Sequence, residues 1–169
     1  MSDKSQVLIT NIRQRAAEGL SVGDRFTITR CFSSEDIVSF AAISRDYNPV
    51  HCDSHFATLK GMREPIAHGL LTASLITEIG GQIGWLASSM SFKFKRPVYA
   101  GETLTCDWVI REIDEQERAK AEISVINGDG VTVLEAEITG VLPNENERQR
   151  LTKMLTEGDP TNGVRNLYA

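Results

Sequence analysis

The stretch Leu70-Leu-Thr-Ala-Ser-Leu-Ile-Thr-Glu-Ile79 decides how this chain folds. Its side chains are apolar or small almost all the way round a helix, and a helix with that pattern is buried on most sides. The Gly80–Gly81 pair that follows predicts the end of the helix, because glycine is the commonest residue just beyond a helix C-terminus. The sequence therefore predicts a buried central helix against which the other elements pack.

Beyond this helix the hydrophobic pattern changes to a period of two, which is typical of β-strands with one buried face. Four runs show it, with apolar side chains at Met90, Phe92 and Phe94, at Leu104, Cys106, Trp108 and Ile110, at Ala119, Ala121, Ile123 and Val125, and at Leu134, Ala136 and Ile138. Turn-forming residues separate the runs at 97–101, 114–117 and 127–130. The last two connections are short enough for hairpins, so we expect a mainly antiparallel sheet.

The region before the helix predicts one more strand and one more helix. Residues 26–32 alternate apolar and polar side chains, and Ser33 with Asp36 then forms a helix-capping pattern. We expect that short helix to end before Pro49. One buried helix with about five antiparallel strands predicts an α+β fold in which the sheet curls around the helix. Such a sheet leaves an edge open, which predicts a homodimer or a higher homo-oligomer.

The composition fits a single folded domain. The chain has 169 residues, 41% of them hydrophobic, which is enough to bury a sizeable core. We expect an N-terminal arm at 1–22, the main domain at 23–143 and a polar tail at 144–169, the tail forming a short surface helix with a loose end. The net charge of −5 argues against a nucleic-acid partner, which would require a basic surface.

The cysteines and the apolar runs indicate the compartment. The three cysteines are widely spaced and form no CxxC pair, so we expect reduced thiols. No apolar run is long enough for a signal peptide core or a membrane span. These features predict a soluble cytoplasmic protein without membrane contact.

The chemistry concentrates in residues 43–69, which hold all three histidines of the chain. Asp46 and His51 lie five positions apart across the Asn48–Pro49 pair, and the proline is expected to stop a helix and turn the chain. Such a turn can direct a carboxylate and an imidazole to one point, as acid–base catalysis requires. The alternative is a capped helix end followed by a polar loop, because Asp-x-Asn-Pro also forms ordinary turns.

Two motifs carry a resemblance to a known family. The segment Asp46-Tyr-Asn48-Pro49-Val-His51, followed by Pro65-Ile-Ala-His68-Gly69-Leu, resembles the signature of the MaoC-like, (R)-specific enoyl-CoA hydratases of the hot-dog fold. The segment from Ser91 to Glu102 also resembles that family, and the likeness extends over roughly residues 32–142. It implies a hot-dog fold, a homodimer and hydration of a trans-2-enoyl thioester to the (R)-3-hydroxyacyl thioester.

The resemblance also implies roles for individual residues. It makes Asp46 and His51 the catalytic pair and Asn48 a supporting residue of the site. It places the amide of Gly69, at the start of the central helix, against the thioester carbonyl. His68 is expected beside Gly69 on the substrate side, or else as a residue that merely positions the turn.

Residue chemistry agrees with these roles. Addition of water to C3 of an enoyl thioester develops negative charge on the carbonyl oxygen, and a helix N-terminus offers unpaired amides and a favourable dipole for it. Gly69 allows close approach because it has no Cβ. Asp46 and His51 can hold one water between them, and which of the two is acid or base stays open. The reaction needs no cofactor, and the sequence has no dinucleotide-binding motif.

Charged residues near the motifs have alternative interpretations. Lys93, Lys95 and Arg96 are candidates for contacts with the phosphates of coenzyme A, although a charged strand face is more often simply solvated. A metal site built from Asp46 and His51 with Asp53 and His55 fits no standard ligand spacing, so we expect no metal.

Two other functions use the same residues. A thioesterase would polarise the same carbonyl while a carboxylate directs water to C1, and a non-catalytic acyl-thioester-binding protein would need neither acid nor base. The Asp46–His51 pair favours the hydratase over both. In either enzyme the acyl group would be carried by coenzyme A or by an acyl carrier protein.

Overall fold

The computed structural model describes residues 12–157, so the expectations for residues 1–11 and for the end of the tail lie outside the described residues. Residues 12–18, the first that are described, are helical. The named elements follow as β1 (Arg25–Cys31), α2 (Ser34–Ser44), the 3-10 turn η1 (Pro49–His51), α3 (Ser54–Leu59), α4 (Gly69–Ile83), β2 (Leu86–Phe94), β3 (Thr103–Ile113), β4 (Arg118–Ile126), β5 (Thr132–Val141) and α5 (Glu145–Thr156).

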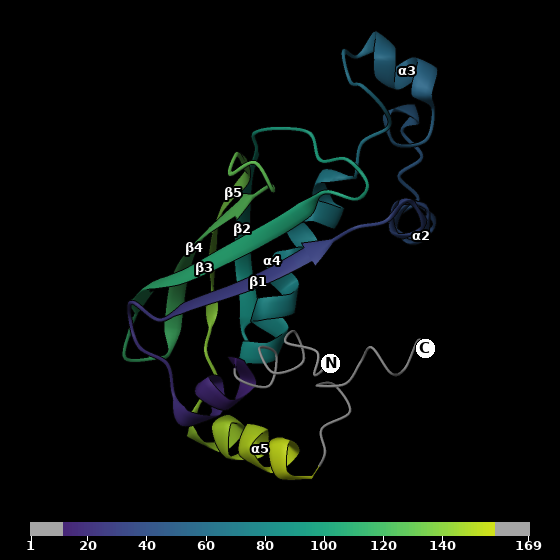
Figure 1. The fold of residues 1–169 in the computed structure, drawn as a ribbon. Helices are drawn as coiled ribbons and strands as arrows, with labels where there is room; N and C mark the ends of the chain where they lie inside the picture. The colour runs from purple at the N-terminus through teal and green to yellow at the C-terminus, as the bar shows by residue number, and fades with distance from the viewer. Residues whose placement is uncertain (1–11, 158–169) are drawn as a thin grey trace.

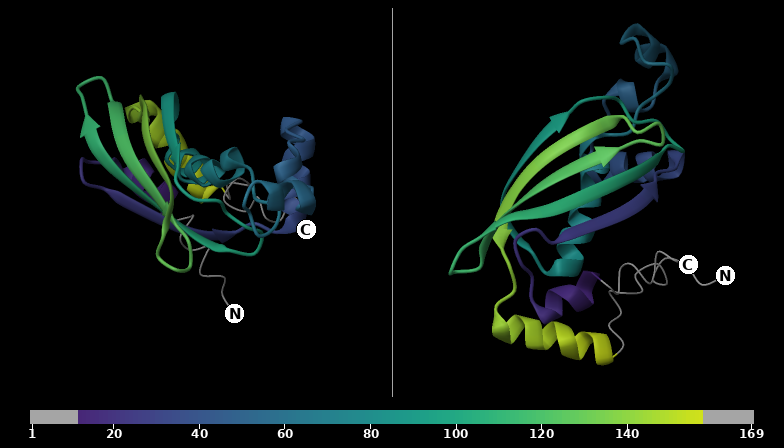
Figure 2. Two further views of the ribbon diagram at one scale, coloured as in Figure 1. Left: turned by 90° about the horizontal axis from the view of Figure 1, so that it is seen from above. Right: turned by 60° about the vertical axis from the view of Figure 1, so that its left-hand side comes forward.

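The five strands form one antiparallel sheet in the order β1-β3-β4-β5-β2. The sheet curls, and α4 lies along its concave face, while α2 and α3 extend beyond one end of the sheet (Figures 1 and 2). The predicted α+β architecture, a sheet curled around a central helix, is therefore confirmed. This is the hot-dog arrangement that the family resemblance implies.

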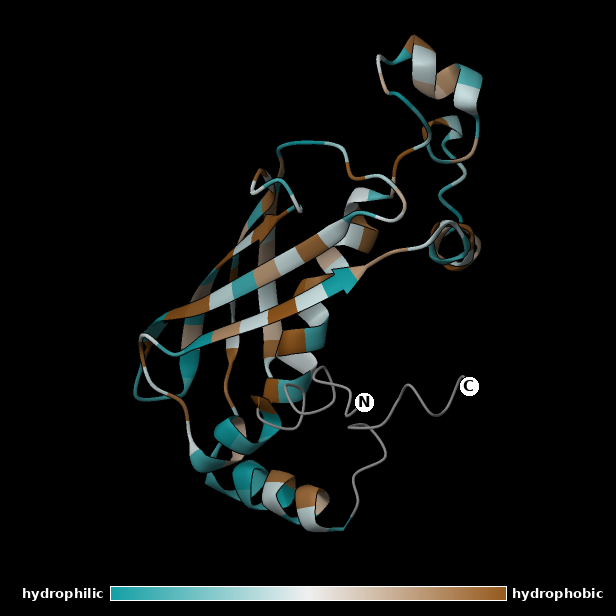
Figure 3. Cartoon of the chain, in the orientation of Figure 1, coloured by the Kyte–Doolittle hydropathy of each residue, from teal (hydrophilic) through white to brown (hydrophobic). Residues whose placement is uncertain are grey.

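The core lies between α4 and the concave face of the sheet. The alternation of hydrophobic and polar residues is visible along the strands, whereas α4 is apolar around much of its surface (Figure 3). Trp108 of β3 is fully buried, as are Ile79 and Ile83 of α4. Burial of a large aliphatic side chain stabilises the fold by about 1.5–3 kcal/mol. The buried side chains of α4 therefore stabilise the sheet in its curled form.

The central helix is longer than the sequence predicts, and the expected stop at Gly80–Gly81 is wrong. The helix continues to Ile83 and ends at Gly84, whose φ of 79° is the left-handed conformation that favours glycine. Gly80 lies inside the helix against Trp108, whose ring would be in ordinary contact, at 3.5 Å, with a Cβ at that position. Tertiary packing therefore outweighs the weak helix propensity of the glycine pair.

The regions flanking the expected domain also contact it. Ile12 and Ala16 of the first helix are buried in the same core as β1 and α4. In α5 no residue is fully buried, and Leu151 packs partly against the core. The first helix thus adds to the main core, and α5 covers it from outside.

Among the described strands, β2 forms one edge of the sheet and pairs with β5. The apolar residues predicted for its inner side stay accessible: Met90 is 40% exposed and Phe94 is 55% exposed. Leu86 on the same strand and Leu70 of α4 are also exposed. Within residues 12–157, α4 contacts β1, β3 and β2, and no further element covers the outer edge of β2. None of the helices within residues 12–157 has the length and apolarity needed to cross a membrane.

Candidate active site

The end of α2 sets the position of Asp46. The helix starts with the predicted capping box between Ser33 and Asp36 and ends at Arg45, which adopts a left-handed conformation with a φ of 59°. The Oγ atom of Ser44 donates to the Phe40 carbonyl and accepts a hydrogen bond from the Asp46 amide. This left-handed residue interrupts the helical path, so the chain turns sharply immediately before the carboxylate. An L-residue rarely adopts this conformation.

The Asn–Pro turn holds the carboxylate in place. Oδ1 of Asp46 accepts a hydrogen bond from the Asn48 amide at 3.2 Å, and Oδ1 of Asn48 accepts one from the Val50 amide at 3.1 Å. Pro49 then begins η1, as expected for a residue with no amide hydrogen to satisfy. The Asn48 side chain is therefore part of the turn, and the second oxygen of Asp46 is left to face the site.

His51 faces that oxygen with a defined nitrogen. Its Nδ1 lies 2.8 Å from the carbonyl oxygen of Ile66. A carbonyl can only accept, so Nδ1 carries the hydrogen and donates, which leaves Nε2 of the neutral ring without one. That Nε2 lies 3.6 Å from Oδ2 of Asp46. The His51 side chain is 10% exposed and the Asp46 side chain 47%, so the pair lies at the boundary between interior and solvent.

His68 lies beneath this pair. It is 1% exposed, and its Nε2–H donates to the backbone carbonyl of Asp46 at 3.0 Å. Its ring stacks on His51 with centroids 3.8 Å apart and an interplanar angle of 27°. Phe40 of α2 contacts the ring from another side, with centroids 4.9 Å apart. His68 thus supports both Asp46 and His51 and does not line the hollow described below.

Asp46, His51 and His68 bring potential ligand atoms within 4.8 Å of one another, which raises the question of a metal ion. Imidazole binds a metal with a lone pair in the plane of its ring at about 2.0–2.1 Å. The His51 and His68 rings are stacked, so their lone pairs run nearly side by side and do not converge on one point. The sequence-based metal candidates Asp53 and His55 lie elsewhere: Asp53 caps α3, and His55 is exposed. This geometry suits acid–base chemistry better than a shared metal.

Gly69 begins α4 at the same place. His68 occupies the N-cap position but makes no side-chain cap bond, and within residues 12–157 the Gly69 amide has no hydrogen-bond acceptor. Asp46, His51 and Gly69 all line one hollow of about 460 Å³. The structure therefore brings the three principal predicted residues together around one space.

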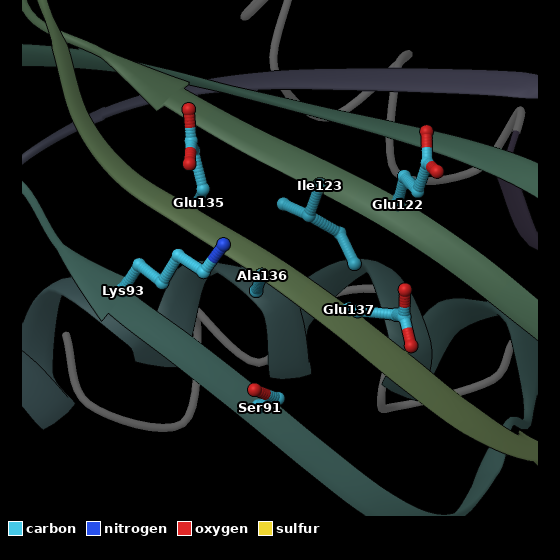
Figure 4. Close-up of a pocket in the computed structure, with 7 residues that line it drawn as sticks. All are labelled: Ser91, Lys93, Glu122, Ile123, Glu135, Ala136 and Glu137. Carbon is cyan, nitrogen blue, oxygen red and sulfur yellow. The ribbon is translucent and has the colours of Figure 1, made fainter.

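The three basic residues proposed for coenzyme A contacts separate in the structure. Arg96 and Lys95 line the hollow that contains Gly69, but the Lys95 ammonium pairs with Glu135 at 3.4 Å. Lys93 does not line that hollow. It lies on the outer face of the sheet and points toward Glu135 in a separate depression (Figure 4).

A second hollow lies on the other side of the pair. Its volume is about 310 Å³, and it is lined mainly by apolar side chains of α2, including Ile37 and Val38. Asp46 and His51 line this hollow as well. The pair therefore stands between two accessible spaces.

Sequence reasoning missed two residues of the site. Phe94 lines the hollow beside Gly69, and Thr72 of α4 lines its inner part. Phe94 belongs to an ordinary alternating strand pattern, so no local signal distinguishes it from a core residue. Its role depends on a contact between β2 and α4 that only the fold creates.

The chain is similar to known proteins over most of its length. A family model described as MaoC like domain matches residues 14–133. An (R)-specific enoyl-CoA hydratase of Aeromonas caviae is 34% identical over 104 residues, which span 59% of this chain and 78% of that protein. A mitochondrial 3-hydroxyacyl-[acyl-carrier-protein] dehydratase of Arabidopsis thaliana is 34% identical over 131 residues, or 74% of this chain and 79% of that protein. The unliganded R-hydratase PhaJ1 of Pseudomonas aeruginosa superposes with a TM-score of 0.70 at 30% identity, covering 76% of this chain and 86% of that chain.

Proposed function

The chain belongs to the MaoC-like domain family and has the hot-dog fold, and on this premise we propose that it is a hydro-lyase acting on acyl thioesters. It adds water to trans-2-enoyl thioesters to give (R)-3-hydroxyacyl thioesters, and it catalyses the reverse dehydration. The observation that carries the proposal is the 3.6 Å separation between His51 Nε2 and Asp46 Oδ2, in the hollow that also holds the Gly69 amide. The names of the similar proteins support the same reaction class.

The pair is spaced to hold one water molecule. Two acceptor atoms 3.6 Å apart can both lie about 2.8 Å from a single water oxygen. The water oxygen adds to C3 while one of its protons moves to Nε2 of His51, and Asp46 binds the other hydrogen. The imidazolium then gives its proton to C2, so the product gains one whole water. Asp46 stabilises the imidazolium between these steps.

The Gly69 amide stabilises the charge that develops during the addition. Attack at C3 pushes an electron pair toward the thioester carbonyl, which becomes an enolate oxygen. An amide at the first position of α4, without a partner among the described residues, can donate to that oxygen, and the helix dipole favours the charge. This interaction grows from ground state to transition state, so it accelerates the reaction.

His68 and Asn48 act as positioning residues in this proposal. His68 fixes the Asp46 carbonyl and the face of the His51 ring, and the backbone amide of Asn48 donates to the Asp46 carboxylate. Because these contacts hold Asp46 and His51 in place before the substrate binds, no free energy is spent on orienting the two groups during the reaction.

Arg96 at the rim of the hollow is the proposed contact for the phosphates of the acyl carrier group. Guanidinium matches phosphate oxygens well, and its side chain is exposed. Lys95 contributes less because Glu135 already pairs with it. The same contact suits coenzyme A and the phosphopantetheine arm of an acyl carrier protein. A turnover assay in which the two acyl thioesters compete shows which carrier the enzyme prefers.

A homodimer is the proposed assembly. The β2 edge exposes Leu86 and Met90, and the Leu70 side chain of α4 is exposed as well. Pairing of two β2 edges would satisfy the free strand groups and cover these apolar side chains. Sedimentation at micromolar concentration tests this assembly, and a monomer would contradict it.

A cytoplasmic setting is proposed from the thiols. Cys31, Cys52 and Cys106 are all free cysteines in the structure, and free thiols persist in a reducing compartment. Microscopy of the full-length protein fused to a fluorescent protein checks the location.

The decisive experiment mixes the purified protein with crotonyl-CoA. Hydration removes the absorbance of the conjugated thioester without releasing a thiol. Release of free thiol would replace the hydratase with the thioesterase, and absence of both signals over a range of chain lengths would favour a binding protein. The absolute configuration of the product, determined by chiral chromatography after hydrolysis, checks the (R) assignment.

A further inference from the structure

Phe94 occupies the space in which a side chain at Gly69 would lie. A Cβ built on Gly69 would be 2.7 Å from Cε1 of Phe94 and 3.0 Å from two further ring atoms. Gly69 begins a regular helix and is not among the residues with positive φ, so its backbone does not require glycine. A side chain at position 69 would instead have to displace the Phe94 ring, which lies directly beside the glycine.

This ring is not placed there by burial in the core. Phe94 is 55% exposed and ends the edge strand β2. Phe92 stacks on its other side, with ring centroids 6.1 Å apart and an interplanar angle of 28°. Phe94 also lines the hollow that contains Asp46 and His51. An accessible aromatic ring is therefore held at the first amide of α4 and faces the space where the reaction would take place.

We propose that Phe94 is a specificity-determining wall of the active site, which admits acyl thioesters that are unbranched at C2 and rejects those with a substituent there. The inference rests on the proposed hydratase function. A carbonyl oxygen bound to the Gly69 amide brings the carbonyl carbon and its neighbour C2 next to the ring. A flat, unbranched enoyl group fits along the ring, whereas a methyl group on C2 competes with it for space.

The same ring has a second effect on the amide. An apolar cover excludes water from one side of Gly69, and a hydrogen bond to developing charge is stronger where water is excluded. Removal of the ring is therefore expected to lower turnover of the unbranched substrate while it opens the site to the branched one. These opposite changes distinguish a selecting wall from a residue that merely holds the structure together.

The test compares crotonyl-CoA with its C2-methylated analogue, (E)-2-methylbut-2-enoyl-CoA, in the wild type, Phe94→Leu and Phe94→Ala. Discrimination by one methyl group in a pocket is typically about 10- to 200-fold. We expect the ratio of kcat/KM for the unbranched over the branched thioester to fall about tenfold or more in Phe94→Ala, and less in Phe94→Leu. The intrinsic reactivities of the two thioesters cancel when this ratio is compared between variants.

Leu59→Ala is the matched control, because Leu59 is exposed on α3 and lines none of the three hollows described. Its ratio should equal that of the wild type. An unchanged ratio in Phe94→Ala, with the wild type active on crotonyl-CoA, overturns the role of Phe94 and leaves the hydratase intact. Inactivity of the wild type on both thioesters defeats the proposed function, and the specificity role falls with it.

A thermal experiment tests the contact without any assay of activity. Gly69→Ala should lower the melting temperature in the wild-type background, because the new methyl group overlaps the ring. In the Phe94→Ala background the same change should be neutral or raise the melting temperature, since alanine is favoured over glycine in a helix. Equal shifts in both backgrounds would show that the ring does not exclude a side chain at Gly69, which overturns the proposed wall.

Discussion

The depression that contains Lys93 (the outer hollow) and the hollow that contains Gly69 (the inner hollow) are similar in size, and both contain carboxylates. They differ in what each carboxylate faces. The outer hollow of about 380 Å³ lies on the exposed side of β2, β4 and β5 and is lined by Glu122, Glu135 and Glu137 (Figure 4). Each of these glutamates pairs with a basic side chain, namely Arg111, Lys95 and Lys120 in turn. In the inner hollow of about 460 Å³, Asp46 instead faces Nε2 of His51.

The difference shows why acidic residues in a hollow do not by themselves indicate catalysis. The outer carboxylates are neutralised by neighbours on a solvated sheet face, where such pairs contribute little. Asp46 is held by a turn, faces a proton acceptor and lies beside the Gly69 amide, which has no acceptor in the described part of the chain. Chemistry therefore depends on how a carboxylate is held and what it faces, and the following predictions test this contrast.

Removal of the acid–base pair should have the largest effect. Asp46→Asn and His51→Gln each keep the approximate shape but lose proton transfer, so each should reduce kcat for crotonyl-CoA by about a hundred- to ten-thousandfold. Because the two groups share one water, the double variant should be scarcely worse than either single one. The melting temperature should change little. Full activity of a folded Asp46→Asn variant would remove Asp46 from the mechanism.

Loss of the Gly69 amide should rank next. Gly69→Pro removes the hydrogen of that amide, and proline is tolerated in the first turn of a helix. Proline also introduces a Cβ that meets Phe94, so Gly69→Ala, which has the Cβ and keeps the amide, is the necessary control. We expect the proline variant to be about a hundred- to a thousandfold slower in kcat than the alanine variant. Equal rates for the two variants would show that the amide has no part in the reaction.

A smaller effect on kcat is expected for His68, which lies beneath Asp46 and His51. His68→Phe keeps an aromatic ring against His51 but loses the hydrogen bond to the Asp46 carbonyl. A displacement of about 1 Å in a catalytic group can cost up to about a hundredfold in rate, so kcat should fall within that range while KM stays nearly constant. A change confined to KM would instead place His68 in substrate binding.

A substitution in the outer hollow should have no effect on activity. Glu137→Gln makes the same carboxylate-to-amide change as Asp46→Asn, but kcat/KM should match the wild type and the free energy of unfolding should change by less than about 0.5 kcal/mol. The hydrogen bond from Lys120 to Glu137 raises the pKa of the Lys120 ammonium, so this pKa should fall toward its ordinary value in the variant. An NMR titration of the lysine side chain measures the shift. A loss of turnover would make the two hollows functionally equivalent and defeat the comparison.

Sequence patterns predicted the elements whose signals are local. The capping pair Ser33 and Asp36, the period-two strands and the buried central helix all depend on neighbours a few positions away. The approach of Asp46 to His51 was also foreseeable, because a single Asn–Pro turn separates them.

Features that depend on distant contacts were not predictable. Gly80 of α4 packs against Trp108, which is 28 positions away by residue number, and the ring of Phe94 lies beside Gly69. The exposure of Met90 follows from the position of β2 at the edge of the sheet, which strand periodicity alone does not reveal. The position of Lys93 in the outer hollow likewise depends on where the neighbouring strands lie.

The strand order β1-β3-β4-β5-β2 has a consequence for folding kinetics. β3, β4 and β5 follow one another through short turns, whereas closure of β1 on β3 joins residues such as Arg25 and Asp107, which are 82 positions apart. Short loops close at lower entropic cost than long ones, so the three-stranded meander is expected to form the nucleus and the edge strands to dock later. The segment that holds Asp46 and His51 lies between β1 and α4, outside that nucleus. Destabilising substitutions in the β3–β4 turn should therefore slow refolding, whereas those in the catalytic segment should mainly accelerate unfolding.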